Sequence, residues 1–170
     1  MVVDDDESIR DTLEAILLRD YNILKAADGQ TALRLLNEHE INVVLLDMLL
    51  PDINGLEILK QIKDRFSDIE VIMITVVKEV DTAVRAMKLG AFHYITKEFD
   101  YDEVLALVEK AIERRQDARE LLYLRTEMKE SMEGEFIIGR SSKMREIHEL
   151  VKKVAHLPPT ILISGESGTG

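Results

Sequence analysis

Carboxylates follow two strongly apolar segments of the sequence, at the point where each segment ends. The first segment, at the start of the chain, precedes Asp4 and Asp5, and the second, residues 41–46, precedes Asp47. If both segments are strands of one parallel sheet, these side chains meet at one edge of that sheet. Grouped carboxylates repel one another unless a cation lies between them, and carboxylate and water oxygens suit Mg²⁺. The pattern therefore predicts a magnesium site.

A hydroxyl and a cationic side chain follow two further apolar segments. Thr75 ends the segment EVIMIT, and Lys97 directly follows the segment AFHYIT. An oxygen nucleophile, a divalent metal, a lysine and a hydroxyl are the groups needed to receive a phosphoryl group, because positioning and charge neutralisation carry most of that reaction. Asp47 is the expected nucleophile, since a carboxylate can form an acyl phosphate.

Each of these residues also has a simpler explanation. The acidic run at residues 4–7 favours a helix N-terminus through capping and the helix dipole. Thr75 is also an ordinary strand residue, and Lys97 an ordinary solvated lysine. All of them fall at the same predicted sheet edge, however, and that coincidence favours a phosphoacceptor site over unrelated features.

Strand-like and helix-like patterns alternate along the chain and position these residues. Apolar residues recur with helical spacing in residues 8–19, 30–39, 56–66, 80–89 and a segment that begins near Tyr101. Strand-like segments lie before and between them, at residues 2–3, within 21–29, and at 41–47, 70–75 and 91–96. This order predicts a doubly wound, five-stranded parallel α/β sheet with its functional site at the carboxyl ends of the strands.

The composition limits the classes of protein to be considered. The chain has 170 residues and a net charge of −11, which argues against nucleic-acid binding by this part alone. It has no cysteine, so disulfides and cysteine-based metal sites are excluded. Its longest apolar runs are strand-length, and its N-terminus lacks the pattern of a signal peptide. We therefore expect a cytoplasmic protein without membrane association.

The last predicted helix continues beyond the first domain, residues 1–115. Polar and charged residues run on without proline or glycine, which gives a linker helix over residues 116–134. Scattered apolar positions form a weak coiled-coil pattern that Arg115 interrupts, namely Val104, Val108, Ala111, Ala118, Leu121 and Leu122. A solvated linker and a dimerisation helix that pairs two copies of the chain both remain open. Gly134 ends the pattern.

Residues 1–115 resemble the receiver domains of bacterial two-component response regulators. The resemblance rests on the segments VVDDDES, VVLLDMLLPDINGLEIL, VIMIT and AMKLGAFHYITK and on their order. It implies a flavodoxin-like sheet with strand order 2-1-3-4-5, and a phosphoryl group that Asp47 receives from a sensor histidine kinase. It also implies that Asp5 and Asp47 bind Mg²⁺ directly, together with the backbone carbonyl of Leu49. Asp4 assists through a water molecule.

The resemblance also assigns the remaining residues of the site. Thr75 and Lys97 bind the phosphoryl oxygens, and Tyr94 matches an aromatic residue that changes rotamer as Thr75 moves towards the phosphate. Two residues depart from the family pattern, because Val76 stands where a small residue is usual and Glu98 where proline is usual. These departures concern the activation geometry, whereas every residue with a chemical role is present.

Residues 135–170 resemble the start of the AAA+ domain in sigma-54-dependent transcription activators of the nitrogen-regulatory-protein-C type. The resemblance rests on IIGRSSKMREI, on the strand-like TILIS and on the glycine-rich GESGTG. The last segment matches the first six positions of a Walker A loop, namely Gly165, Glu166, Ser167, Gly168, Thr169 and Gly170. The lysine of that motif would lie beyond the last residue. ATP binding and contacts with sigma-54 RNA polymerase and DNA are therefore implied only for a longer protein, and this chain is expected not to be an enzyme.

Two other functions fit parts of the pattern. A haloacid-dehalogenase-like aspartyl-phosphate hydrolase also uses a strand-end aspartate, but that class has an acid two residues after the nucleophile, where this chain has Leu49. A degenerate receiver that serves only as a protein-interaction or dimerisation module is suggested by Val76 and Glu98. A phosphorylation-dependent switch in a sigma-54 activator is the favoured hypothesis, because all of the groups for phosphoryl transfer are present.

Overall fold

The computed structural model describes residues 1–76, 80–135, 141–155 and 162. The chain divides into two compact units, Met1–Tyr123 and Leu124–Gly170. The first unit contains the sheet and all of the predicted phosphoacceptor residues. No helix in the described part of the chain is both long and apolar enough to cross a membrane.

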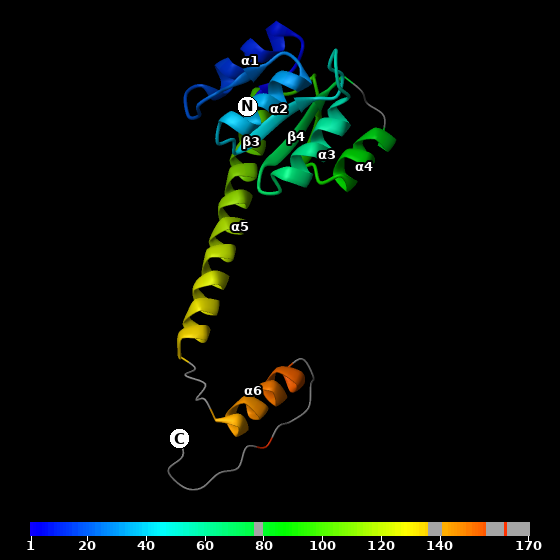
Figure 1. Cartoon of the computed structure of the whole chain (residues 1–170). Coiled ribbons are helices and arrows are strands. Elements are labelled where there is room, and N and C mark those ends of the chain that lie inside the picture. The colour runs from blue at the N-terminus through cyan, green and yellow to red at the C-terminus, as the bar shows by residue number, and fades with distance from the viewer. Residues whose placement is uncertain (77–79, 136–140, 156–161, 163–170) are drawn as a thin grey trace. The chain divides into compact units, whose positions relative to one another are not determined.

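A five-stranded sheet forms the centre of the first unit (Figure 1). Its order is β2-β1-β3-β4-β5, and every neighbouring pair is parallel, which confirms the predicted fold. The strands are β1 (Val2–Val3), β2 (Lys25–Ala26), β3 (Val43–Asp47), β4 (Glu70–Thr75) and β5 (His93–Thr96). Strand β2 is shorter than predicted, because it lies at the sheet edge and pairs only with the two residues of β1.

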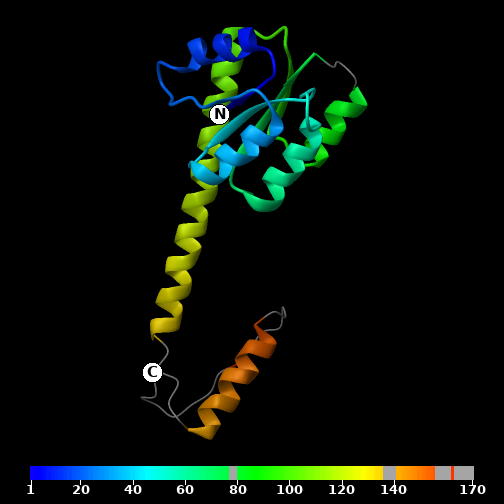
Figure 2. The same ribbon diagram turned by 45° about the horizontal axis from the view of Figure 1, so that its top comes forward.

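Helices cover both faces of this sheet, as Figure 2 shows. They are α1 (Glu7–Leu17), α2 (Gly29–Glu38), α3 (Gly55–Arg65), α4 (Val80–Lys88) and α5 (Tyr101–Glu135). Polar side chains cap three of them by accepting a hydrogen bond from the first turn, namely Asp6 for α1, Asp28 for α2 and Asn54 for α3. These caps start α1 and α3 directly after the loops that follow β1 and β3, the two strands at whose ends the predicted acids lie.

The core has one apolar layer on each face of the sheet. The first packs α1 and α5 against the strands through Leu13, Leu17, Val104, Val108 and Ala111. The second packs α2, α3 and α4 through Ala32, Leu36, Ile58, Leu59, Ile62 and Ala86. Strands β3 and β4 are buried along their whole length, as expected for central strands of a parallel sheet.

The predicted apolar seam on helix α5 is wrong in its first half. Val104, Val108 and Ala111 are buried against the sheet, at 1%, 4% and 0% exposure. They are therefore unavailable to pair two copies of the chain. Arg115 does not interrupt a seam either, because it is buried and its guanidinium binds both the carbonyl and the carboxylate of Asp68.

The second unit contains the helix α6 (Ser142–Val154) besides the end of α5. The large apolar residues of α6 are exposed, namely Met144, Ile147, Leu150 and Val151. Helix α5 continues through Gly134, where the pattern was predicted to end, since one glycine costs a helix only about 1 kcal/mol relative to alanine. The Walker-like residues 165–170, and all but Leu162 of the strand predicted at 160–164, lie outside the described residues.

Candidate functional site

Four strand ends bring the predicted residues together at the carboxyl edge of the sheet. Asp47 is the last residue of β3 and Thr75 the last of β4. Asp4 directly follows β1, and Lys97 directly follows β5. The backbone N–H of Lys97 donates to the carbonyl of Thr75 at 2.9 Å, which extends the β4–β5 ladder to the lysine. The parallel register thus places the acids, the hydroxyl and the ammonium group at one edge.

Three aspartates form the acidic cluster that the sequence predicts. Carboxylate oxygens of Asp4, Asp5 and Asp47 all lie within 4.8 Å of one another. Asp4 and Asp47 are buried, at 1% and 2% exposure, whereas Asp5 is exposed and leaves its side of the cluster open to solvent. An all-oxygen set that is open to water fits Mg²⁺, which usually keeps several of its waters. These residues can therefore hold the predicted cation.

Lys97 neutralises the buried part of the cluster. Its ammonium nitrogen lies 2.8 Å from Asp47 Oδ2 and 2.9 Å from Asp4 Oδ2. Burial lowers the pKa of Lys97, but the hydrogen bonds that it donates to Asp47 and Asp4 outweigh this and raise the pKa. Burial raises the pKa of Asp4, although the hydrogen bond from Lys97 opposes the shift. A single ammonium group compensates only part of the charge of three carboxylates, and a divalent cation would balance the remainder.

Three residues beside the acidic cluster, Thr75, Leu49 and Val76, differ in how far they are exposed to solvent. Thr75 is fully buried at the end of β4. The N–H of Leu49 donates to Asp47 Oδ1 at 3.3 Å, so the Leu49 backbone lies beside the carboxylate while its side chain is 52% exposed. Val76 is 59% exposed. Most of the Val76 side chain therefore faces solvent, although the residue is larger than is usual at this position.

The predicted switch residue Tyr94 lies on β5 and is half-buried. It lines an apolar surface pocket between β5 and α4 together with Val80, Ala83, Val84 and Met87.

The peptide bond between Lys97 and Glu98 is trans. The loop after the lysine therefore has ordinary peptide geometry without the usual proline.

Arg10 is a residue of the site that sequence reasoning missed. Its Nη1 donates to the backbone carbonyls of Asp4 and Asp5, at 2.7 and 2.9 Å. The carboxylate of Asp4 also accepts the N–H of Asp6 at 2.9 Å. These bonds fix the loop that carries the two acids. The feature of the sequence that could have indicated this role is an arginine within the helix that begins directly after the acidic run.

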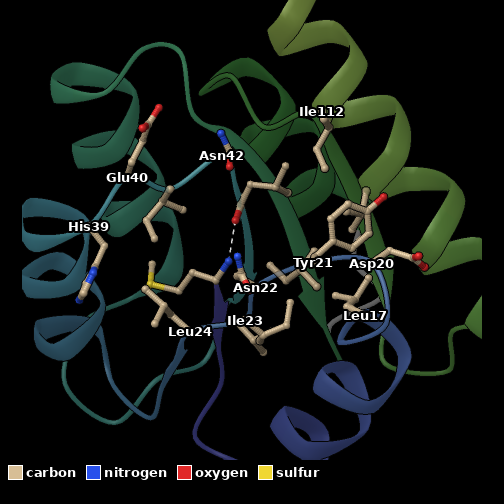
Figure 3. Close-up of a pocket in the computed structure, with 16 residues that line it drawn as sticks. Leu17, Asp20, Tyr21, Asn22, Ile23, Leu24, His39, Glu40, Asn42 and Ile112 are labelled. Carbon is tan, nitrogen blue, oxygen red and sulfur yellow. Dashed lines mark hydrogen bonds between the residues drawn. The ribbon is translucent and has the colours of Figure 1, made fainter.

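A separate pocket lies at the opposite, amino edge of the sheet (Figure 3). Its walls include Tyr21 before β2 and Asn42 before β3, and the Met1 ammonium donates there to the Val43 carbonyl at 2.8 Å. Within the part of the chain that the structure describes, the acidic cluster is the group of side chains suited to hold a metal. We therefore assign the functional site to the carboxyl edge.

This fold and site define a class of protein. The family described as the response regulator receiver domain matches residues 1–109. The chain belongs to this family. The strand order, the three aspartates at the carboxyl edge and Lys97 after β5 are the features that the sequence resemblance predicted.

The relatives of the chain are longer regulators. It is 37% identical to the DNA-binding transcriptional regulator NtrC of Proteus hauseri, over 99% of this chain and 35% of NtrC. It is 34% identical to the regulatory protein AtoC of Escherichia coli, over 100% of this chain and 37% of AtoC. The chain thus spans about a third of the length of these relatives.

Among solved structures, the chain is similar both to a longer regulator and to an isolated receiver domain protein. NtrX from Brucella abortus matches with a TM-score of 0.70 and 30% identity, over 91% of this chain and 34% of NtrX. A CheY-like receiver domain protein from Methanospirillum hungatei matches with a TM-score of 0.66 and 26% identity, over 69% of this chain and 94% of that protein.

Proposed function

We propose that Asp47 receives a phosphoryl group from a sensor histidine kinase of a two-component system. The position of the Asp47 carboxylate carries this proposal: it lies at a buried strand end, beside two further acids and 2.8 Å from Lys97. An oxygen of Asp47 attacks phosphorus and forms the new bond. The bond between phosphorus and the kinase histidine breaks, and its electron pair returns to the imidazole nitrogen.

The acidic cluster fits the metal that this reaction needs. Asp5, Asp47 and the backbone carbonyl of Leu49 would hold Mg²⁺, and Asp4 would assist through a water molecule. Mg²⁺ bound there would supply positive charge beside the phosphoryl oxygens. Arg10 supports the site by holding the main chain of the two N-terminal acids.

Two donors bind the phosphoryl oxygens that remain. Lys97, which now bonds to Asp47, donates to one of them, and the hydroxyl of Thr75 donates to another. Movement of Thr75 towards the phosphate then leaves room for the ring of Tyr94 to change rotamer. The pocket between β5 and α4 supports this role, because Tyr94 lies in its wall.

The signal is passed to a sigma-54-dependent transcription activator in the cytoplasm. Similarity to NtrC and AtoC over nearly all of the chain supports this step. We assign residues 1–115 to the receiver, 116–134 to a linker and dimerisation helix, and 135–170 to the start of an AAA+ ATPase domain. In the longer protein, residues 165–170 would take part in ATP binding, and parts beyond this chain would contact sigma-54 polymerase and DNA.

Incubation with acetyl phosphate and Mg²⁺, followed by intact-mass spectrometry, tests the phosphoacceptor. We expect one phosphoryl adduct on the parent chain and none on Asp47→Asn. The control Asp64→Asn, which removes an exposed carboxylate from α3, should be labelled like the parent, and chelation of Mg²⁺ should prevent labelling. Equal labelling of Asp47→Asn would reject the assignment, and an unlabelled parent would favour a degenerate receiver.

A further inference from the structure

Asp52 connects the loop after Asp47 to helix α2. Its carboxylate accepts two backbone hydrogen bonds, from Gly29 to Oδ1 and from Gln30 to Oδ2, both at 2.8 Å. These N–H groups begin α2 and have no partner within the helix, and the helix dipole favours a negative charge beside them. The bond from Gly29, supported by that from Gln30, lowers the pKa of Asp52.

The contact between the loop and α2 is close as well as polar. A Cβ atom at Gly29 would lie 2.5 Å from Ile58 Cδ1 and 3.3 Å from Asp52 Oδ1. A side chain at residue 29 would therefore require the buried Ile58 side chain to shift, whereas glycine lets the first turn of α2 approach both α3 and the loop without that shift. Helix α2 itself packs on the sheet through the buried Ala32 and Leu36, so it offers the loop a fixed support.

Other hydrogen bonds lie within the loop between β3 and α3 and at the start of α3. The N–H of Gly55 donates to the carbonyl of Met48 at 2.9 Å, and the side chain of Asn54 caps α3. The Gly55–Met48 bond joins the two ends of the loop, whereas the Asp52 bonds attach the loop to a neighbouring helix. Leu49, whose carbonyl is assigned to the metal, lies between Met48 and Asp52 in the sequence.

We propose that Asp52 is a positioning residue for phosphoryl transfer, which holds this loop so that the Leu49 carbonyl stands beside Asp47 at the metal site. The inference rests on the proposed function of Asp47. Asp52 touches neither the metal nor the phosphoryl group and acts through the main chain that joins it to Leu49. The loss of contacts that orient metal ligands lowers metal affinity by roughly 10-fold or more.

Two matched variants separate positioning of the loop from support of the helix. Asp52→Ala removes the bonds to Gly29 and Gln30. Asp28→Ala removes the other cap of α2, in which the N–H and hydroxyl of Thr31 donate to Asp28 at 2.7 and 3.0 Å. Both variants weaken the start of α2, but only the first releases the loop.

Isothermal titration calorimetry gives the Mg²⁺ affinity of the full chain, and thermal unfolding gives its stability. We expect a similar fall in Tm for both variants, but a Kd for Mg²⁺ that rises about 10-fold only in Asp52→Ala. Phosphorylation of that variant by acetyl phosphate should slow at subsaturating Mg²⁺ and recover at saturating Mg²⁺. An unchanged Kd in Asp52→Ala, or an equal rise in Asp28→Ala, overturns the proposal.

The calorimetric measurement keeps this inference separate from the proposed function. If the parent binds Mg²⁺ but is not phosphorylated, the proposed function fails while the two Kd values still decide the role of Asp52. If the parent does not bind Mg²⁺, both proposals fail. Asp52→Asn keeps one acceptor oxygen and should therefore show an intermediate Kd.

Discussion

At the scale of single residues, the two buried carboxylates at the carboxyl edge of the sheet are compensated by the same ammonium group. Asp4 and Asp47 are buried together and both accept hydrogen bonds from Lys97. Each of the three groups therefore depends on the other two, because a buried charge that loses its partner is strongly destabilising. A site in which acids exceed cations is also one that a divalent metal stabilises.

Lys97→Met keeps most of the side-chain volume and removes its charge. The buried carboxylates then lose their common donor, and we expect the free energy of unfolding without Mg²⁺ to fall by about 3–5 kcal/mol. Added Mg²⁺ should restore part of this loss, since it replaces the missing positive charge. Urea denaturation with and without Mg²⁺ measures both effects.

Lys60→Met is the control for that experiment, because Lys60 is exposed on α3. Its effect should stay within about 0.5 kcal/mol. If Lys97→Met costs no more than Lys60→Met, the carboxylates do not depend on the lysine for their compensation.

The residues that sequence reasoning found and missed differ in the atoms they bind. Asp47 and Lys97 were predictable, because strand periodicity places them at one sheet edge and their charges are complementary. Arg10 binds backbone carbonyls and Asp52 binds backbone N–H groups. Nearly every residue carries both of these groups, so no pattern of partner side chains marks such contacts in a sequence.

At the scale of elements, the strands were easier to predict than the partners of the last helix. Strand β4 covers the predicted residues 70–75, since a short, continuous apolar run is typical of a buried parallel strand. Apolar spacing on α5 showed that one face is buried, but not what buries it. The sheet covers Val104 and Val108, and a second copy of the chain would have required the same spacing.

Two arginines of α5 form hydrogen bonds with residues at the amino edge of the sheet. Arg115 donates to the carbonyl and carboxylate of Asp68 at 3.0 and 2.9 Å. Arg119, one turn later, bonds to Glu40 at 3.2 Å and to Asp68 at 2.9 Å. Burial raises the pKa of Asp68, but the hydrogen bonds from Arg119 and Arg115 together outweigh it and lower the pKa.

Arg115→Met should reduce the free energy of unfolding by about 1–3 kcal/mol, because it removes two hydrogen bonds, one of them to a charged group. Arg119→Met should cost less than Arg115→Met, since the ion pairs of Arg119 are exposed. The lowered pKa of Asp68 stabilises the fold only above the unfolded value of about 3.9 and is lost as pH falls through the folded pKa. Urea unfolding should therefore show a smaller effect of Arg115→Met at pH 3 than at pH 7. An equal effect at both pH values would show that the Asp68 carboxylate contributes nothing.

At the scale of the whole molecule, α5 is the element that extends from the receiver unit into the second unit. Only residues 98–100 separate Lys97 from the start of α5. The phosphoacceptor site and the helix that leaves the receiver are therefore close along the chain. The first part of this helix is fixed on the sheet, so contacts with a second copy have to involve residues beyond Arg115.

Exposed apolar residues on α5 mark the place for such a contact. Leu121, Leu122, Tyr123 and Leu124 are between 48% and 67% exposed. Several large apolar side chains exposed close together favour an interaction site over plain solvent exposure. Ala118 lies three and four residues before Leu121 and Leu122, so these three residues share one side of the helix. They form the part of the predicted seam that the sheet leaves accessible.

We expect the chain to associate through this part of α5, with a sedimentation coefficient that rises with protein concentration. The double variant Leu121→Glu, Leu122→Glu places like charges in the seam of both copies and should remain monomeric, because their desolvation and repulsion oppose association. Leu18→Glu is the matched control, since Leu18 is an equally exposed leucine, at 62%, beside α1, and it should sediment like the parent. Circular dichroism should give the same helix content for all three chains. A parent that sediments as a monomer at every concentration, or a Leu18→Glu variant that dissociates like the double variant, would remove the α5 dimer from the mechanism.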